Sequence, residues 1–219
     1  MQQKERLGGI IDHTYLKGDA HKATIVKLCG EAKKFGFKTV CVMPQWLPTA
    51  VQELAGSGVL PTTVISFPEG MDPLEAKLAG IKSAIDRGAK ELDMVMNRRH
   101  LKNKNYTKSL EEMTRAVEAA SGVTLKIILE TSELSPQEIV IACALASVAG
   151  VDFVKTSTGF ATGGATYDDV LLMKQTVSNG VLVKASGGIR SLSQAKKMVE
   201  AGAARIGCSS SCEIIGELT

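Results

Sequence analysis

Aromatic side chains are scarce in this sequence of 219 residues, where they make up 4% of the total. Proteins that bind single-stranded nucleic acid stack bases on aromatic rings, so this scarcity disfavours that class. The net charge is +3, and the 26 basic and 23 acidic residues form no long block of one sign. Such a balance suits a small anionic ligand and requires no polyanion. We therefore expect no nucleic-acid partner.

Long apolar runs are also missing. No window approaches the roughly 18 apolar residues of a membrane span, and the amino-terminal MQQKERLGGI lacks the apolar core of a signal peptide. The five cysteines, at positions 29, 41, 143, 208 and 212, are an odd number without a CxxC pair. Such a set predicts reduced thiols and no disulfide framework. We expect a cytoplasmic protein without a membrane partner.

The histidines are too few and too widely spaced for an evident metal site. His13, His21 and His100 show neither an HxH nor an HxxxH pattern, so we expect no metal and no other cofactor. His13, within DHTYL, is more typical of a packed residue at a strand end than of a catalytic base. Cys41, within TVCVMP, is expected to be a small core residue.

The chain contains no linker rich in Pro, Gly or Ser, which favours one domain over residues 1–219. Seven helical patterns alternate with β-rich segments along the sequence. The helical patterns lie over residues 21–35, 48–56, 73–88, 107–122, 136–150, 167–180 and 192–202. Eight βα units predict an α/β protein with a (β/α)8, or TIM, barrel, since open doubly wound sheets more often have about five or six strands. Only SCEIIGELT follows the last strand, so the final helix should be short. The predicted strands are 9–14, 39–44, 62–68, 91–97, 125–130, 151–157, 181–187 and 205–210.

Three consecutive predicted strands each carry a lysine among apolar neighbours: Lys126, Lys155 and Lys184. The alternation of side chains places Lys155 on the face of Phe153 and Lys184 on the face of Leu182, which directs both lysines into one cavity. Burial and neighbouring cations lower the pKa of a lysine. A lysine that is neutral near pH 7 can attack a carbonyl and form an imine.

Carboxylates accompany these lysines on the strands. Asp12, Glu91, Asp93 and Glu130 can balance the lysine charges and can also move protons. The alternative is a buried ion-pair network without chemistry. A cluster of perturbed charges at the mouth of a barrel favours function.

Glycines and hydroxyl residues follow the last three strands, in TSTGF, ASGGIR and GCSSS. Each cluster alone could be an ordinary tight turn. Together, at successive strand ends of a barrel, they predict a phosphate site built from backbone N–H groups and hydroxyls. The basic run NRRHLKNKNYTK, residues 97–108, could also attract phosphate, but we expect it to be a solvated loop.

Eight motifs, DHTYL, CVMP, SFPEG, ELDMVMN, LKIILET, VKTSTGF, KASGGIR and GCSS, together resemble the deoxyribose-phosphate aldolases from about residue 7 to residue 212. The resemblance implies a class I, metal-independent lyase that cleaves 2-deoxy-D-ribose 5-phosphate reversibly to acetaldehyde and D-glyceraldehyde 3-phosphate. It also implies a phosphorylated sugar as partner and a homo-oligomer, either a dimer or a tetramer.

The resemblance also assigns residues. It implies that Lys155 is the Schiff-base lysine, that Lys184 is the second catalytic lysine and that Asp93 relays protons. Asp12 and Lys126 match supporting charged positions. The implied substrate and phosphate contacts are Thr158, Gly159, Gly187, Gly188, Gly207, Ser209 and Ser210.

The sequence departs from the family at two places. After Asn97 it has Arg98 and Arg99, where the family commonly has a small apolar residue and a glycine, and its carboxyl terminus is brief. Two other readings remain open. One is a different phosphosugar barrel, either a transaldolase-like aldolase or an isomerase. The other is a non-catalytic binding barrel, against which the lysine pair argues.

Overall fold

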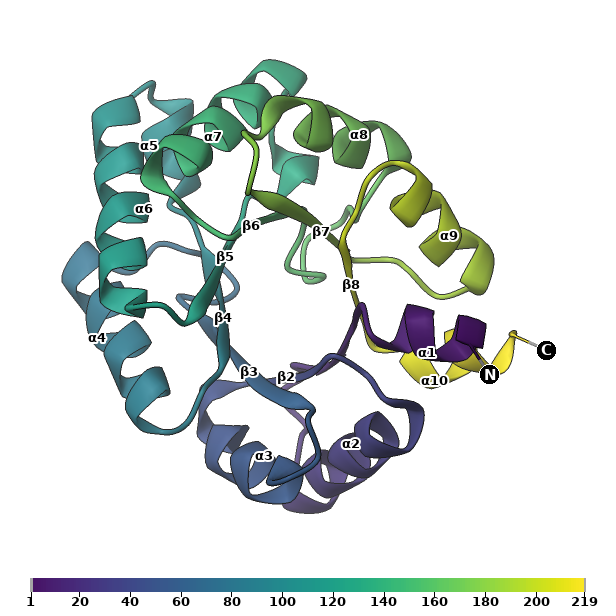
Figure 1. Cartoon of the computed structure of the whole chain (residues 1–219). Coiled ribbons are helices and arrows are strands. Elements are labelled where there is room, and N and C mark those ends of the chain that lie inside the picture. Colours follow the sequence, from purple (N-terminus) through teal and green to yellow (C-terminus); the bar gives the residue numbers. More distant parts are fainter. Residues whose placement is uncertain (1, 219) are drawn as a thin grey trace.

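Eight parallel strands close into a barrel in the computed structural model, which describes residues 2–218 (Figure 1). Each strand pairs with the next along the chain, and β1 pairs with β8 to close the ring. The predicted (β/α)8 barrel is therefore confirmed. The strands are β1 Ile11–Tyr15, β2 Thr39–Val42, β3 Leu60–Ile65, β4 Glu91–Val95, β5 Thr124–Ile128, β6 Phe153–Lys155, β7 Leu182–Ser186 and β8 Arg205–Cys208.

Helices surround the barrel (Figure 1). The seven helical patterns of the sequence correspond to α2, α3, α4, α6, α7, α8 and α9. The last helix, α10, has 6 residues, which confirms the prediction of a short final helix. The bounds are α1 Gln2–Gly8, α2 Lys22–Phe35, α3 Leu47–Leu54, α4 Leu74–Asp86, α5 Arg98–Lys102, α6 Tyr106–Ala120, α7 Pro136–Ala149, α8 Tyr167–Thr176, α9 Leu192–Glu200 and α10 Ser211–Gly216.

The prediction of a solvated loop for the basic run 97–108 is wrong. Arg98–Lys102 forms α5, because the side chain of Asn97 accepts a hydrogen bond from the backbone N–H of Arg99 at 3.1 Å and so caps the helix. The side chain of Arg98 is buried and donates to Glu133 at 2.9 Å. An ion pair with a residue far along the chain thus removes this arginine from solvent.

The two faces of β4 have different surroundings. Leu92 and Met94 of β4 belong to the apolar core between strands and helices, whereas Asp93 bonds to lysines within the barrel. Strand register then sets the neighbours of the interior residues, since Lys126 lies opposite Asp93 and Lys155 lies opposite Lys184. The barrel interior is therefore charged, and the apolar core lies outside it. Between residues 2 and 218, no helix is long and apolar enough to cross a membrane.

Candidate active site

One carboxylate connects the three buried lysines inside the barrel. Oδ2 of Asp93 accepts hydrogen bonds from Nζ of Lys155 at 2.7 Å and Nζ of Lys184 at 2.8 Å. Its Oδ1 accepts from Nζ of Lys126 at 3.0 Å. The exposed fraction is 3% for Lys155 and 0% for the other two lysines and for Asp93. The three strands therefore bring their lysines to a single anion, as the predicted inward orientation requires.

Two further carboxylates lie beside this group. Asp12 pairs with Lys184 through Oδ2 and with Arg205 through Oδ1, the latter at 2.8 Å. Oε2 of Glu91 lies 2.5 Å from Nζ of Lys126 and 3.0 Å from Nη1 of Arg205. Asp12, Glu91 and Asp93 thus balance the lysine charges, as the sequence predicted.

The cluster contains one more cationic side chain than carboxylates. Four basic groups, Lys126, Lys155, Lys184 and Arg205, meet the three carboxylates Asp12, Glu91 and Asp93. Among the described residues, Lys155 forms an ion pair only with Asp93, which Lys126 and Lys184 share. Buried charges are costly unless paired, so the cluster is electrically balanced when Lys155 is neutral.

The directions of the pKa shifts agree with this excess of one cationic side chain. Burial lowers the pKa of Lys155 below its usual value, and the charge of Lys184 adds to this effect while Asp93 opposes it. Burial also acts on Lys184, but Asp12 and Asp93 outweigh it and raise the pKa of Lys184. Carboxylates likewise raise the pKa of Lys126. The expected lowering of the lysine pKa therefore holds for Lys155, whereas the carboxylates raise the pKa values of Lys126 and Lys184.

The two central carboxylates are stable anions. Burial alone would raise their pKa values, but Lys184, Lys126 and Arg205 lower the pKa of Asp12 to about 2. Against the same effect of burial, the three lysines hold the pKa of Asp93 well below its usual value. In the resting protein Asp93 is therefore a carboxylate that holds the ammonium group of Lys184 beside Lys155.

Glu130 does not join the lysine cluster, so the prediction that it balances a lysine is wrong. Its Oε2 accepts hydrogen bonds from the backbone N–H of Thr158, at 3.0 Å, and from the Thr158 hydroxyl. The backbone of Glu130 has a φ of 58°, which turns the chain after β5 toward the loop that follows β6. Glu130 therefore orders the loop that begins with Thr158.

The glycines of the predicted phosphate site begin the loops after β6 and β7. Gly159, Gly187 and Gly188 have positive φ values of 85°, 89° and 77°, a conformation that favours glycine. The two loops touch, because the N–H of Ala165 donates to the carbonyl oxygen of Gly187 at 3.0 Å. Ser209 follows β8 and is exposed, while Ser210 is half-buried. The loops thus present backbone at the carboxyl ends of β6, β7 and β8.

Gly207 differs from the other glycines because it lies within β8 and is buried. A Cβ atom at this position would lie 2.9 Å from Cε of Lys184, which is too close for carbon atoms. The absence of a side chain at Gly207 therefore provides the space that the Lys184 side chain occupies. Its position in the sequence, as the first residue of the GCSSS run, indicated a phosphate contact and gave no sign of this role.

Arg205 and an aromatic pair in the loops after two strands were not predicted from the sequence. Arg205 lies 5.3 Å from the ring centre of Phe153 and joins Asp12 to Glu91. Phe67, after β3, and Phe160, after β6, meet edge to face with ring centres 5.2 Å apart. Aromatics are rare in this chain, and these two lie in the loops that follow β3 and β6, which was an available signal. The position of Arg205 at the start of the last strand was another.

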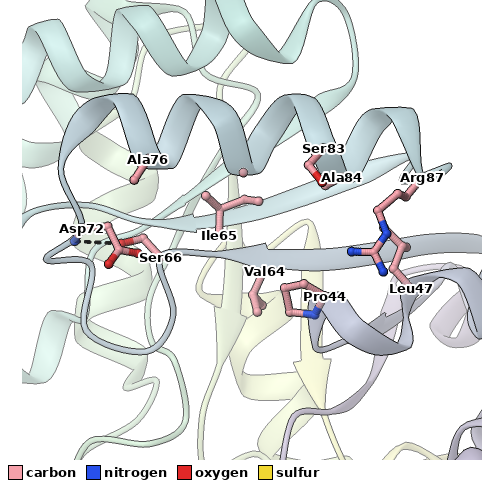
Figure 2. A pocket seen from close by; sticks show the side chains of 11 residues that line it. Pro44, Leu47, Val64, Ile65, Ser66, Asp72, Ala76, Ser83, Ala84 and Arg87 are labelled. Carbon is pink, nitrogen blue, oxygen red and sulfur yellow. Dashed lines mark hydrogen bonds between the residues drawn. The ribbon is translucent and has the colours of Figure 1, made fainter.

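Two features lie outside the cluster of buried lysines and carboxylates. A cavity of about 190 Å³ is bounded by Leu47 of α3, Ile65 of β3 and Ala76 of α4, and Arg87 lines its other end (Figure 2). It contains none of the strand lysines. The second feature is His13, which is packed 5.0 Å from the ring of Phe37, as predicted.

Cys41 is buried in a small apolar cluster with Leu16 and Val64. Burial raises the pKa of its thiol to about 12, which keeps it protonated. This agrees with the prediction of a small core residue.

A (β/α)8 barrel with a buried lysine that shares its carboxylate with two other lysines suits a class of enzyme that uses an amine as nucleophile. The model of the DeoC/LacD family aldolases matches residues 9–214. The chain belongs to this family. The resemblance found in its motifs is thereby confirmed.

Its relatives cover nearly the whole chain. The deoxyribose-phosphate aldolase of Lysinibacillus sphaericus is 50% identical over 98% of this chain and 97% of its own. That of Geobacillus sp. is 49% identical over 97% and 96%. The structure of the tetrameric deoxyribose phosphate aldolase from Aeropyrum pernix, 32% identical, superposes with a TM-score of 0.92 over 99% of this chain and 92% of its own.

Replacement of Gly207 by alanine should displace Lys184. Because the new Cβ would lie 2.9 Å from Cε of Lys184, we expect kcat to fall by about tenfold or more while the fold persists. Steady-state kinetics and thermal unfolding would measure both effects. Gly30→Ala is the matched control, since nothing lies within 4 Å of a Cβ at that helical position. Unchanged kinetics in Gly207→Ala would contradict the assignment of this space to Lys184.

Proposed function

We propose that this chain is a class I aldolase that cleaves 2-deoxy-D-ribose 5-phosphate reversibly to acetaldehyde and D-glyceraldehyde 3-phosphate. Relatives that share about half of its residues carry the name of that activity. The observation that carries the proposal is the state of Lys155, a buried amine whose one carboxylate partner is shared with two other lysines. Such an amine is neutral at a lower pH than a free lysine and can act as a nucleophile.

The chemistry follows from a neutral Lys155. Its amine attacks the C1 aldehyde of the open-chain sugar, and loss of water from the carbinolamine gives an iminium ion. The iminium withdraws electrons from the C2–C3 bond as a base removes the proton of the C3 hydroxyl. Cleavage releases D-glyceraldehyde 3-phosphate and leaves an enamine. Protonation of the enamine and hydrolysis then free acetaldehyde and restore the amine.

Asp93, Lys184 and water are the proposed proton carriers. The contact of one Asp93 oxygen with both Nζ atoms, at 2.7 and 2.8 Å, supports this role. The resting pKa of Asp93 is low and that of Lys184 is high, so neither group exchanges a proton readily before substrate binds. We propose that iminium formation changes the local charge and allows the transfer. Asp12 and Lys126 support the pair through their ion pairs.

The substrate phosphate is proposed to bind at the loops after β6, β7 and β8. Positive φ angles and the absence of side chains let the backbone approach an anion closely. Thr158 lies at the start of this site and is held by Glu130. The proposed contacts are Gly159, Gly187, Gly188, Gly207, Ser209 and Ser210, with Gly207 also making room for Lys184.

We also propose a cytoplasmic, single-domain homo-oligomer, either a dimer or a tetramer. All five cysteines are free, which fits a reducing compartment. The solved relative from Aeropyrum pernix is described as tetrameric. Val140 and Val148 on α7 are 38% and 74% exposed and offer an apolar face for self-association.

The direct test is the release of glyceraldehyde 3-phosphate from deoxyribose 5-phosphate in a coupled assay. We expect turnover without added metal and full activity after treatment with EDTA, because the iminium supplies the electron sink. Borohydride in the presence of acetaldehyde should leave one adduct on Lys155, detectable by peptide mass spectrometry. Loss of activity on chelation at a temperature at which the chain stays folded, restored by zinc, would contradict the metal-independent mechanism.

Substitution of the two lysines should separate their roles. In Lys184→Leu, the loss of a neighbouring cation should raise the pKa of Lys155, so the rising limb of the pH–rate profile moves to higher pH. We expect activity at pH 7 to fall by roughly ten- to a hundredfold, where each factor of ten corresponds to about 1.4 kcal/mol, and to recover partly at alkaline pH.

Lys155→Leu should be inactive at every pH, because no imine can form. Lys82→Leu, on an exposed face of α4, is the control and should retain the wild-type profile. If Lys155→Leu still traps acetaldehyde in the barrel while Lys184→Leu does not, the two roles are reversed.

A carboxylate in the phosphate site should repel the substrate. We expect Ser209→Asp to raise KM for deoxyribose 5-phosphate at least about tenfold, while the activity toward unphosphorylated deoxyribose changes much less. Ser178→Asp, exposed in the connection between α8 and β7, is the matched control. Equal losses for both substrates would show that the phosphate lies elsewhere.

A further inference from the structure

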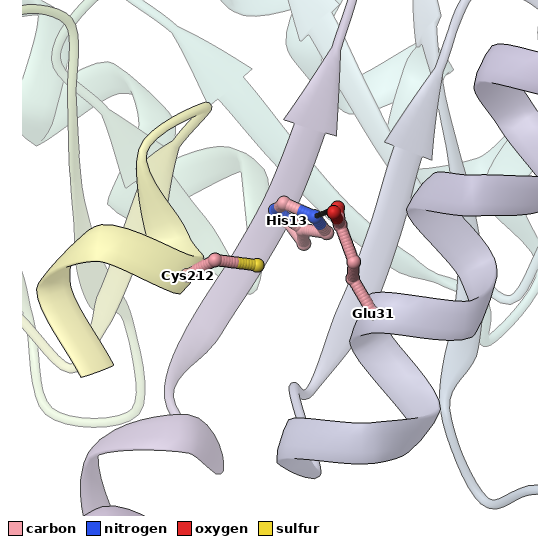
Figure 3. Close-up of side chains that lie close together, drawn as sticks. All are labelled: His13, Glu31 and Cys212. Carbon is pink, nitrogen blue, oxygen red and sulfur yellow. Dashed lines mark hydrogen bonds and ion pairs between the residues drawn. The ribbon is translucent and has the colours of Figure 1, made fainter. Parts of the chain in front are cut away.

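The fold brings together three potential metal ligands that are far apart in the sequence. His13 of β1, Glu31 of α2 and Cys212 of α10 each offer one ligand atom, and these atoms all lie within 4.8 Å of one another (Figure 3). Nε2 of His13 lies 3.0 Å from Oε2 of Glu31. The next residue back, Asp12, points into the barrel, so this group lies on the outer side of β1 and apart from the lysine cluster.

The donor set and its spacing suit a zinc ion. Zn²⁺ takes imidazole nitrogen at about 2.0 Å and thiolate sulfur at about 2.3 Å in tetrahedral geometry, which puts neighbouring donor atoms about 3.3 to 3.6 Å apart. The His13–Glu31 separation of 3.0 Å is already near that range, and the 4.8 Å limit requires a contraction of about 1.2 to 1.5 Å at most. Cys212 is half-buried and Glu31 retains exposed surface, so a cation can enter from solvent.

The hydrogen bonding of His13 also leaves the ring free to bind a cation. Nδ1 of His13 has no hydrogen-bond partner among the described residues, so the ring is not committed to a second contact that would fix its tautomer. A bound cation would take the place of the Cys212 thiol proton.

We propose that His13, Glu31 and Cys212 form a zinc site with three protein ligands and one water, which ties the final helix α10 to β1 and α2. The competing partner of Glu31 is weak, since Nζ of Lys27 lies 3.8 Å from its Oε1 and that lysine side chain is 78% exposed. The role of the ion is structural. It lies outside the barrel, and the proposed aldolase chemistry does not pass through it.

The positions of the three potential ligands along the sequence gave no sign of the proposed zinc site. The expectation of no metal rested on histidine pairs, of which the chain has none, whereas the fold supplies a different donor from each of three segments. A cation that binds all three would stabilise the folded chain by mass action, because the unfolded chain holds these groups apart.

The test uses the full chain freed of metal with a chelator and then dialysed, with Co²⁺ as an optical probe and Zn²⁺ as a competitor. We expect one Co²⁺ per chain with a thiolate-to-cobalt charge-transfer band, displaced by Zn²⁺. Cys212→Ser should lose the band, and Glu31→Gln should bind Zn²⁺ at least about tenfold more weakly. Glu213→Gln, which alters a neighbouring exposed carboxylate, is the control and should keep the band.

Thermal unfolding gives a second readout. Zn²⁺ should raise the Tm of the wild-type chain and of Glu213→Gln but not that of Cys212→Ser, which is chosen because replacement of the packed His13 could impair folding. A wild-type chain without the charge-transfer band, or an equal Zn²⁺-induced rise in Tm in Cys212→Ser, would overturn the proposal. Neither the cobalt spectrum nor the Tm depends on aldolase activity, so both results are independent of the proposed function.

Discussion

The excess of one cation inside the barrel is the constraint on which the rest of the site depends. Water cannot compensate buried charges, so each must find an opposite charge or lose its own. Arg205 cannot lose its proton, and Asp12, Glu91 and Asp93 hold Lys126 and Lys184 in their charged forms. Lys155 is the group left without a carboxylate of its own. Its chemistry is thus a property of the whole cluster.

Closure of the barrel makes this cluster possible. Asp12 of β1 lies near Arg205 of β8 because those strands pair, although 193 residues separate the two side chains in sequence. Register then places Lys155 beside Lys184, and the missing side chain at Gly207 admits the latter. In an open sheet the edge strands would be exposed to water, and that water would screen the same charges. The barrel therefore supplies both the geometry and the dry surroundings that shift the pKa of Lys155.

Predictions made from the local sequence were wrong where a residue far along the chain supplied the hydrogen-bond or ion-pair partner. The basic run after Asn97 had the composition of a solvated loop, but Glu133 provides a carboxylate that holds Arg98 within a helix. Glu130 had the position of a counter-charge for a lysine, but the threonine hydroxyl and N–H of Thr158 bind it instead. In both cases the competing partner lies in another segment and leaves no trace in the local pattern.

The sequence by itself determined the eight strands, most of the surrounding helices, the inward lysines and three of the four carboxylates expected beside them, because alternation and helical period act over a few residues. The motifs also indicated the family. Only the tertiary structure decided which lysine lacks a carboxylate of its own, that Arg205 completes the cluster and that His13 meets Glu31 and Cys212. Those properties depend on distances between segments that the chain holds far apart, and electrostatic balance is set by distances in space.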